Sequence, residues 1–203
     1  MDRIPHIVIV HQDHVPDAVF QDFRDAVAAD GLDFEMEAVP RPGPFAGLEW
    51  VLPTAAMLFV AQGYFNGFLG EMGKDHYQAL KAGLQALAKR FAAMKVTLIR
   101  TPGKVAQNQP YSLVFSILFA ADDGRLFKFL MPIEVEDADR DRAIEAFLAF
   151  ACSYATDAFP PTEKAVFTTA RGVGGMVLLA FNSDAGRIQV MNPITRAFEP
   201  PTV

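Results

Sequence analysis

The chain has 203 residues, of which 51% are hydrophobic and 21% charged, and its formal net charge at pH 7 is −6. This length and composition are typical of a globular protein with one sizeable core. We expect a single α+β domain over residues 1–203, with subdomains 1–104 and 105–203 as the alternative. The negative charge excludes general affinity for nucleic acid, because phosphate binding depends on clustered Lys and Arg.

The first forty residues predict a β-α-β unit. The run at 6–10 (HIVIV) is a short apolar strand, and it is too short for the core of a signal peptide, so we expect a cytoplasmic protein. A helix is expected from about Pro16 to Asp30, because proline is favoured in the first turn and Gly31 would end the helix. Residues 32–38 then alternate apolar and acidic side chains, which is typical of a half-buried strand.

Three polar residues, His11, Asp13 and His14, stand where the first strand ends. Side chains at that end of a strand commonly face a crevice, so they are candidates for ligand binding; the alternative is a polar loop that caps the helix. They also resemble the second half of the metal motif HxHxDH of the metallo-β-lactamase family, which implies a role as zinc ligands. The family's first histidine falls on Ile9 here, and only His76 remains downstream. We therefore predict no metal and no cofactor.

The longest run without a charged side chain extends from Trp50 to Gly70. A helix over residues 51–70 would be about 30 Å long, enough to cross the hydrocarbon of a bilayer. Polar residues interrupt the run and no Lys/Arg cluster flanks it, so we expect a long apolar helix that packs on the sheet. A helix shared by two copies and insertion into a membrane are the alternatives. Gln62 and Asn66 would share one side of this helix and need polar partners, which makes them further candidates for ligand binding.

The helix after this run has clear amphipathic periodicity. Its apolar residues recur at spacings of three and four, and they are Tyr77, Leu80, Leu84, Leu87, Phe91 and Met94. Asp75 and Gln78 are expected to form a capping box at its start.

The same helix start supplies the catalytic candidates, Lys74, Asp75 and His76. A histidine beside a carboxylate at a helix start can act as a general base. If His11, Asp13 and His76 converged, they would suit hydrolysis or nucleotide processing.

The middle of the chain is basic, because no carboxylate occurs between His76 and Ala121. We expect these cations to pair with acidic neighbours from the flanking regions, with an anion-binding surface as the alternative. The residues are Lys81, Lys89, Arg90, Lys95, Arg100 and Lys104.

The remaining sequence predicts strands and one more helix. Residues 111–121 and 125–132 should form a hairpin around Asp122, Asp123 and Gly124. A helix is expected at 137–154, with Cys152 buried in it. The glycine-rich segment 171–175 is expected to be a hairpin turn. Further strand segments are expected at 96–100, 165–169, 176–182 and 186–191.

These elements predict an α+β fold with a mixed, largely antiparallel sheet that begins with a β-α-β unit. A long apolar helix and an amphipathic helix should pack against this sheet. No pattern in the sequence is diagnostic of an enzyme. We predict a non-catalytic module that binds a ligand or a protein and self-associates. The alternatives are a hydrolase-type or nucleotide-processing enzyme that uses His11, Asp13 and His76, and a membrane-acting protein that inserts residues 50–70.

Overall fold

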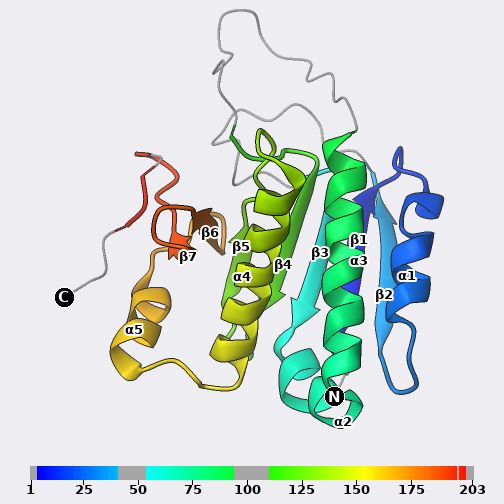
Figure 1. Cartoon of the computed structure of the whole chain (residues 1–203), viewed down its shortest axis with the longest axis horizontal. Helices are drawn as coiled ribbons and strands as arrows, with labels where there is room; N and C mark the ends of the chain where they lie inside the picture. The colour runs from blue at the N-terminus through cyan, green and yellow to red at the C-terminus, as the bar shows by residue number, and fades with distance from the viewer. Residues whose placement is uncertain (1–3, 41–53, 94–109, 196, 200–203) are drawn as a thin grey trace, which may run out of the picture.

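The computed structural model describes residues 4–40, 54–93, 110–195 and 197–199. The described strands are β1 (Ile7–Gln12), β2 (Phe34–Val39), β3 (Ala56–Ala61), β4 (Phe115–Ala120), β5 (Leu126–Phe129), β6 (Met176–Asn182) and β7 (Arg187–Val190). The α-helices are α1 (Gln21–Val27), α2 (Leu69–Met72), α3 (Lys74–Ala92), α4 (Asp137–Ala155) and α5 (Pro161–Thr169). The strands form one mixed sheet in the order β2-β1-β3-β4-β5-β6-β7, and α1, α3 and α4 lie in a row against one face of it (Figure 1). The predicted α+β fold is confirmed.

The opening β-α-β unit is confirmed, since β1 and β2 are parallel neighbours and α1 connects them. The helix is shorter than the expected span 16–30. A 3-10 turn at Asp17–Val19 precedes it, and Ala28 already has an extended backbone. Gly31 then turns the chain with a φ of +83°, a conformation that glycine adopts without steric cost.

The uncharged run is not a long helix, which corrects the prediction for residues 51–70. Residues 51–53 lie outside the described chain, residues 56–61 form the interior strand β3, and a π-helical turn (Tyr64–Phe68) then leads into α2. A buried strand and a buried helix have the same apolar composition, so periodicity could not separate them. Within the described parts of the chain, none of the helices has the length and hydrophobicity of a membrane span.

Parallel and antiparallel neighbours alternate across the described sheet. The three pairs β1–β3, β4–β5 and β6–β7 are antiparallel, and the other three pairs are parallel. The sheet is therefore evenly mixed rather than largely antiparallel. The predicted hairpin β4–β5 is confirmed, and Gly124 takes a φ of +82° in its turn.

The segment 165–169 is not a strand but the end of α5, which begins with Pro161 in its first turn and buries only Phe167. The segment contains too few apolar residues for its periodicity to distinguish a strand from a helix with one buried side. The glycine-rich segment 171–175 consequently connects a helix to β6 and is not a hairpin turn. The expected strand at 96–100 lies outside the described residues.

The two long helices occur as predicted, at α3 and α4. Leu80, Leu84, Leu87 and Phe91 are buried along α3, whereas Met94 lies outside the described residues. The capping box is wrong, since no side-chain hydrogen bond caps α3. Instead Gly73 stands at the N-cap with a φ of +76°.

Phenylalanine rings fill the space between the sheet and the helices. Phe129 of β5 stacks on Phe147 of α4 with ring centroids 4.8 Å apart, and Phe91 of α3 stacks on Phe115 of β4 at 4.9 Å. Offset and edge contacts of this kind add stability beyond the area they bury. The phenylalanine content therefore builds the core on the helix-covered face.

Candidate functional site

His11 lies at the carboxyl end of β1, as predicted, but its ring is buried against Phe20. The Nδ1 atom is 3.1 Å from the carbonyl oxygen of Gln12, and Nε2 is 3.2 Å from Asp17 Oδ1. Asp13 and His14 are exposed beside it. Both ring nitrogens of His11 thus already face oxygen atoms of the protein.

His76 is also buried, at the first turn of α3, and it joins three elements. Its Nε2 donates to the carbonyl oxygen of Val27, the last residue of α1, at 2.9 Å. The hydroxyl of Tyr64 lies 2.9 Å from the other ring nitrogen, Nδ1, and hydrogen-bonds to it. Burial raises the pKa of the Tyr64 hydroxyl, which keeps it protonated and able to donate. The arrangement uses both nitrogens of His76 for structure.

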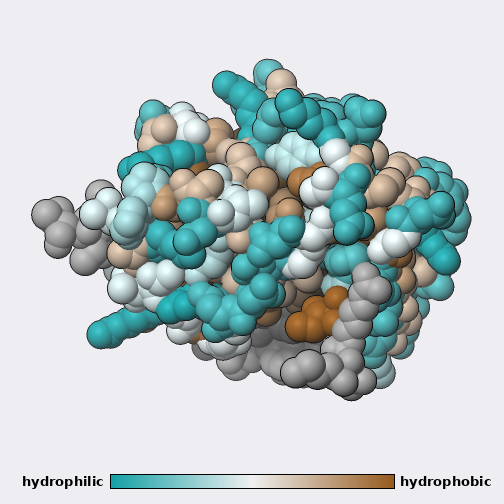
Figure 2. Space-filling view, turned by 90° about the horizontal axis from the view of Figure 1, so that it is seen from below, coloured by the Kyte–Doolittle hydropathy of each residue, from teal (hydrophilic) through white to brown (hydrophobic). Residues whose placement is uncertain are grey.

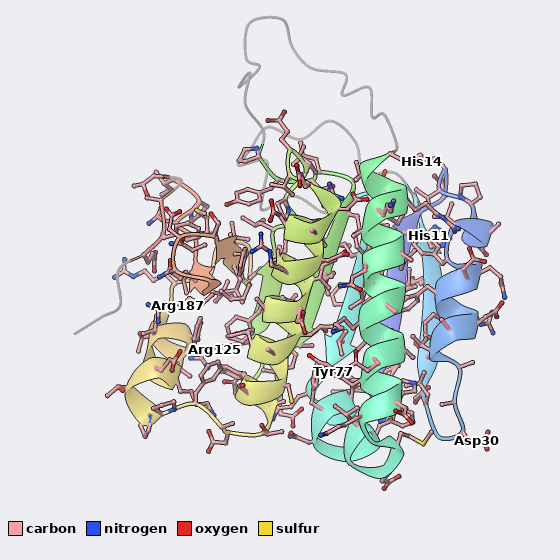
Figure 3. All side chains as sticks on the ribbon, viewed as in Figure 1. His11, His14, Asp30, Tyr77, Arg125 and Arg187 are labelled. Atoms are coloured by element: carbon pink, nitrogen blue, oxygen red, sulfur yellow. The ribbon has the colours of Figure 1, made fainter. Side chains whose placement is uncertain are left out.

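The structure does not bring His11 and His76 together. His6 packs on Phe68, and Phe68 packs on His76, so His76 lies near the start of β1. His11 is five residues further along this strand, which corresponds to about 16 Å. Figure 3 shows the same separation, with His11 and His14 near one end of α3 and Tyr77, the neighbour of His76, near the other. The combination of His11, Asp13 and His76 is therefore not one site.

The described residues contain no group of three or more His, Cys, Asp or Glu side chains arranged to hold a metal ion. The resemblance of His11, Asp13 and His14 to a zinc motif consequently has no geometric counterpart in this part of the chain. Lys74 and Asp75 are exposed at the start of α3.

Gln62 and Asn66 have different surroundings. The amide of Gln62 donates to Ala155 O at 3.3 Å, and its Oε1 accepts from the backbone N–H of Asp122 at 2.9 Å. Gln62 therefore links the end of α4 to the β4–β5 turn. Asn66 is exposed in the π-helical turn.

Three basic side chains of α3, namely Lys81, Lys89 and Arg90, pair with carboxylates of the neighbouring helices, as expected. Lys81 reaches Glu145 of α4 at 3.1 Å, and Lys89 reaches Asp137 at 2.6 Å. Arg90 contacts Asp22 of α1 at 2.5 Å. The other three cations, Lys95, Arg100 and Lys104, lie outside the described residues. The described part of the basic region is thus neutralised locally.

Sequence analysis missed a polar cluster at the β4–β5 turn. Asp123 accepts hydrogen bonds from Tyr154 OH at 2.8 Å and from Arg125 at 2.7 Å, and Arg125 also donates to Thr168 O. Partial burial opposes ionisation of Asp123, but the hydrogen bonds from Tyr154 and Arg125 outweigh it and lower its pKa. Only the turn signal around Gly124 marked this place in the sequence.

A shallow hollow of about 480 Å³ lies close to this cluster, between the end of α4 and α5. Phe159, Pro161 and Ala165 line it beside a 2.6 Å ion pair between Lys164 and Asp157. Lys164 also lies 5.1 Å from the centre of the Tyr154 ring. The charged groups at this hollow are therefore already paired within the protein.

Cys152 is half-buried in α4, and burial raises the pKa of its thiol. A thiol with a raised pKa carries little thiolate at neutral pH and is a poor nucleophile. Nothing in its described surroundings makes Cys152 a reactive centre.

The face of the sheet opposite the helices carries apolar side chains that no described helix covers. Four apolar side chains, Val8 and Val10 of β1 and Met57 and Phe59 of β3, alternate with the core residues of these strands and are only half-buried. Val8 is paired with Phe59, and Val10 with Met57. None of the four belongs to either apolar cluster of the described residues. We call these four residues the open face.

From β4 to β7, side chains on the same side of the sheet are buried. Leu118 and Lys128 continue the row of Phe59, and both are buried. Burial lowers the pKa of Lys128 to about 8. Over β5 to β7, Tyr111, Leu113 and Phe198 pack on a second apolar cluster, which consists of Leu130, Leu178, Ala180 and Met191. The partly exposed apolar area is thus concentrated on β1 and β3.

Among the described residues, the strongly exposed apolar side chains do not form a comparable patch. They are single residues on separate segments, namely Ile4, Met72, Val135 and Ile194. The end of the molecule near α2 is mainly hydrophilic, with separate small apolar areas (Figure 2). Isolated apolar residues of this kind are normal on protein surfaces.

The fold and this surface define a two-layer α+β protein with helices on one face of a mixed sheet. No protein-family model matches the chain, and neither the curated proteins nor the solved structures gave a significant match.

Proposed function

We propose that this protein is a non-catalytic module that binds another protein chain through the open face. The observation that carries the proposal is the half-buried row of Val8, Val10, Met57 and Phe59 on the side of the sheet opposite the helices. Strands that are apolar on both faces are typical of sheets covered on both sides. The described helices cover one side only, so the open face is suited to a partner.

The edges of the sheet are less suitable for a partner than its face. β2 carries Glu35 and Glu37, and charged side chains on an edge strand oppose strand addition. On the other edge, the N–H of Glu199 donates to Val190 O, so part of β7 is already paired. Pairing through a face instead buries apolar side chains between two layers.

The partner can be a second copy, as self-association was expected from the sequence, or a different protein. A photo-crosslinking amino acid, p-benzoylphenylalanine, placed at Phe59 tests both cases in cells, because it replaces one aromatic side chain by another. We expect a discrete adduct from position 59, whose mass distinguishes a second copy from another chain. The matched control is the same substitution at Ile194, which is exposed outside the open face. Equal adducts from both positions, or none from position 59, would contradict the proposal.

A further inference from the structure

The rows of the open face end in glutamates. On the strand β2, Glu35 is the neighbour of Val8 and Glu37 is the neighbour of Val10. Phe34 and Met36, which alternate with them, pack against the helix-side core, so both glutamates belong to the opposite side. Adjacent strands are about 4.8 Å apart, which places these carboxylates directly beside the apolar residues.

These carboxylates are not neutralised within the described chain. Glu35 and Glu37 are exposed, and neither forms an ion pair with a described residue. Residues 4–40 contain Arg24 as their one Lys or Arg, against Asp13, Asp17, Asp22, Asp25, Asp30, Asp33, Glu35 and Glu37. Lys81, Lys89 and Arg90 of α3 lie on the helix layer and pair with carboxylates there. The apolar surface therefore has an acidic rim that no ion pair with a described cation neutralises.

We infer that the occupant of the open face is a segment of a different protein that combines apolar side chains with Lys or Arg. This inference rests on the proposed function and adds the chemistry of the partner. Apolar side chains of the segment cover Val8, Val10, Met57 and Phe59, and its cations meet Glu35 and Glu37. A second copy that docked through its own open face would place the same two glutamates, Glu35 and Glu37, against those of the first copy, so like charges would meet at the rim. Complementary potentials of this kind decide between partners more than they raise affinity.

Two short peptides test the inference on the full chain. One alternates valine with lysine and the other alternates valine with glutamate, so they match in length and apolar content. Binding is followed by the ¹³C-methyl signal of Met57 in NMR titrations. We expect the lysine peptide to bind at least about tenfold more tightly than the glutamate peptide. We also expect this preference to shrink several-fold when NaCl is raised from about 0.05 to about 0.5 M, because salt screens exposed charges.

The double variant E35Q/E37Q keeps size and polarity but removes both charges. It should bind the lysine peptide about five- to tenfold more weakly and leave the glutamate peptide less disfavoured. The matched control D25N/D30N removes two exposed carboxylates of the α1 region and should leave binding of the lysine peptide unchanged within about twofold.

The possible outcomes test two claims separately: that the partner is basic, and that the open face is a binding surface. Equal binding of both peptides at Met57 would overturn the basic partner while the open face remains a binding surface. A dimer that is lost on F59K, with neither peptide bound, would assign the open face to a second copy and also overturn the basic partner. A monomer with no Met57 shift for either peptide would overturn the inference, and the absence of crosslinks at position 59 would then overturn the proposed function as well.

Discussion

The two faces of the same strands have different surroundings. On β1 and β3, Ile7, Ile9, Leu58 and Val60 point toward the helices and are at most 1% exposed. Val8, Val10, Met57 and Phe59 alternate with them and remain half-buried on the other side. Both sets are apolar, so these strands carry apolar side chains on both faces of the sheet. The described helices cover only one of these faces. The helix-covered face holds the fully buried residues, so we expect it to contribute most of the stability, whereas the open face is where we propose that another chain binds.

The largest expected effect comes from removing an aromatic ring on each face. F119A deletes a fully buried ring that contacts Phe127, Phe150 and Tyr154, and should lower the free energy of unfolding by about 3–5 kcal/mol. F59A removes a half-buried ring and should cost about 1 kcal/mol in the isolated chain. Urea denaturation measures both variants. Equal losses would show that the two faces contribute alike and would break the comparison.

The second effect concerns polar groups within the helix-covered layer. H76A leaves the Tyr64 hydroxyl and the Val27 carbonyl without their partner, and should destabilise the protein by about 2–3 kcal/mol. Y64F removes one hydroxyl only and should cost about 1 kcal/mol. Thermal or urea unfolding gives both values. If the free energy of unfolding of H76A is within about 0.5 kcal/mol of that of the native chain, His76 is not a structural residue. A catalytic role for His76 would then have to be considered again.

The smallest expected effect comes from adding a methyl group where α1 and α3 are in close contact. A Cβ atom at Gly83 of α3 would lie 2.8 Å from Cδ2 of the buried Phe23 ring, so G83A should destabilise by about 1–2 kcal/mol. Alanine in a helix is otherwise better than glycine by about 1 kcal/mol. G67A, where no atom lies within 4 Å of the new Cβ, is the control and should be neutral or slightly stabilising. A stabilised G83A would mean that this packing is looser than the structure shows.

Local patterns predicted the periodic elements well. The 3.6-residue periodicity identified α3 and α4, and the turn around Gly124 identified the β4–β5 hairpin. The prediction failed at β3 and at α5, for the same reason in each case. A short apolar segment contains too few residues to show whether its periodicity is that of a helix or of a strand. Tertiary contacts then determine which of the two conformations it adopts.

The candidate site was less predictable than the fold. The sequence marks His11 and His76 as site candidates, but the two side chains make separate buried contacts near opposite ends of β1. The open face was invisible because Met57 and Phe59 were placed on a helix rather than on a strand beside Val8 and Val10. The cluster of Asp123, Arg125 and Tyr154 joins residues from a turn and a distant helix, which spacing alone does not connect.

The sequence by itself determined the helix-covered core, the opening β-α-β unit and the acidic character of residues 4–40, because each depends on local composition and periodicity. Only the tertiary structure decided which side of β1 and β3 the described helices cover and that Glu35 and Glu37 border the open face. Strand order and register carry this information, since they place residues from distant segments about 5 Å apart on one surface, and no local pattern specifies them.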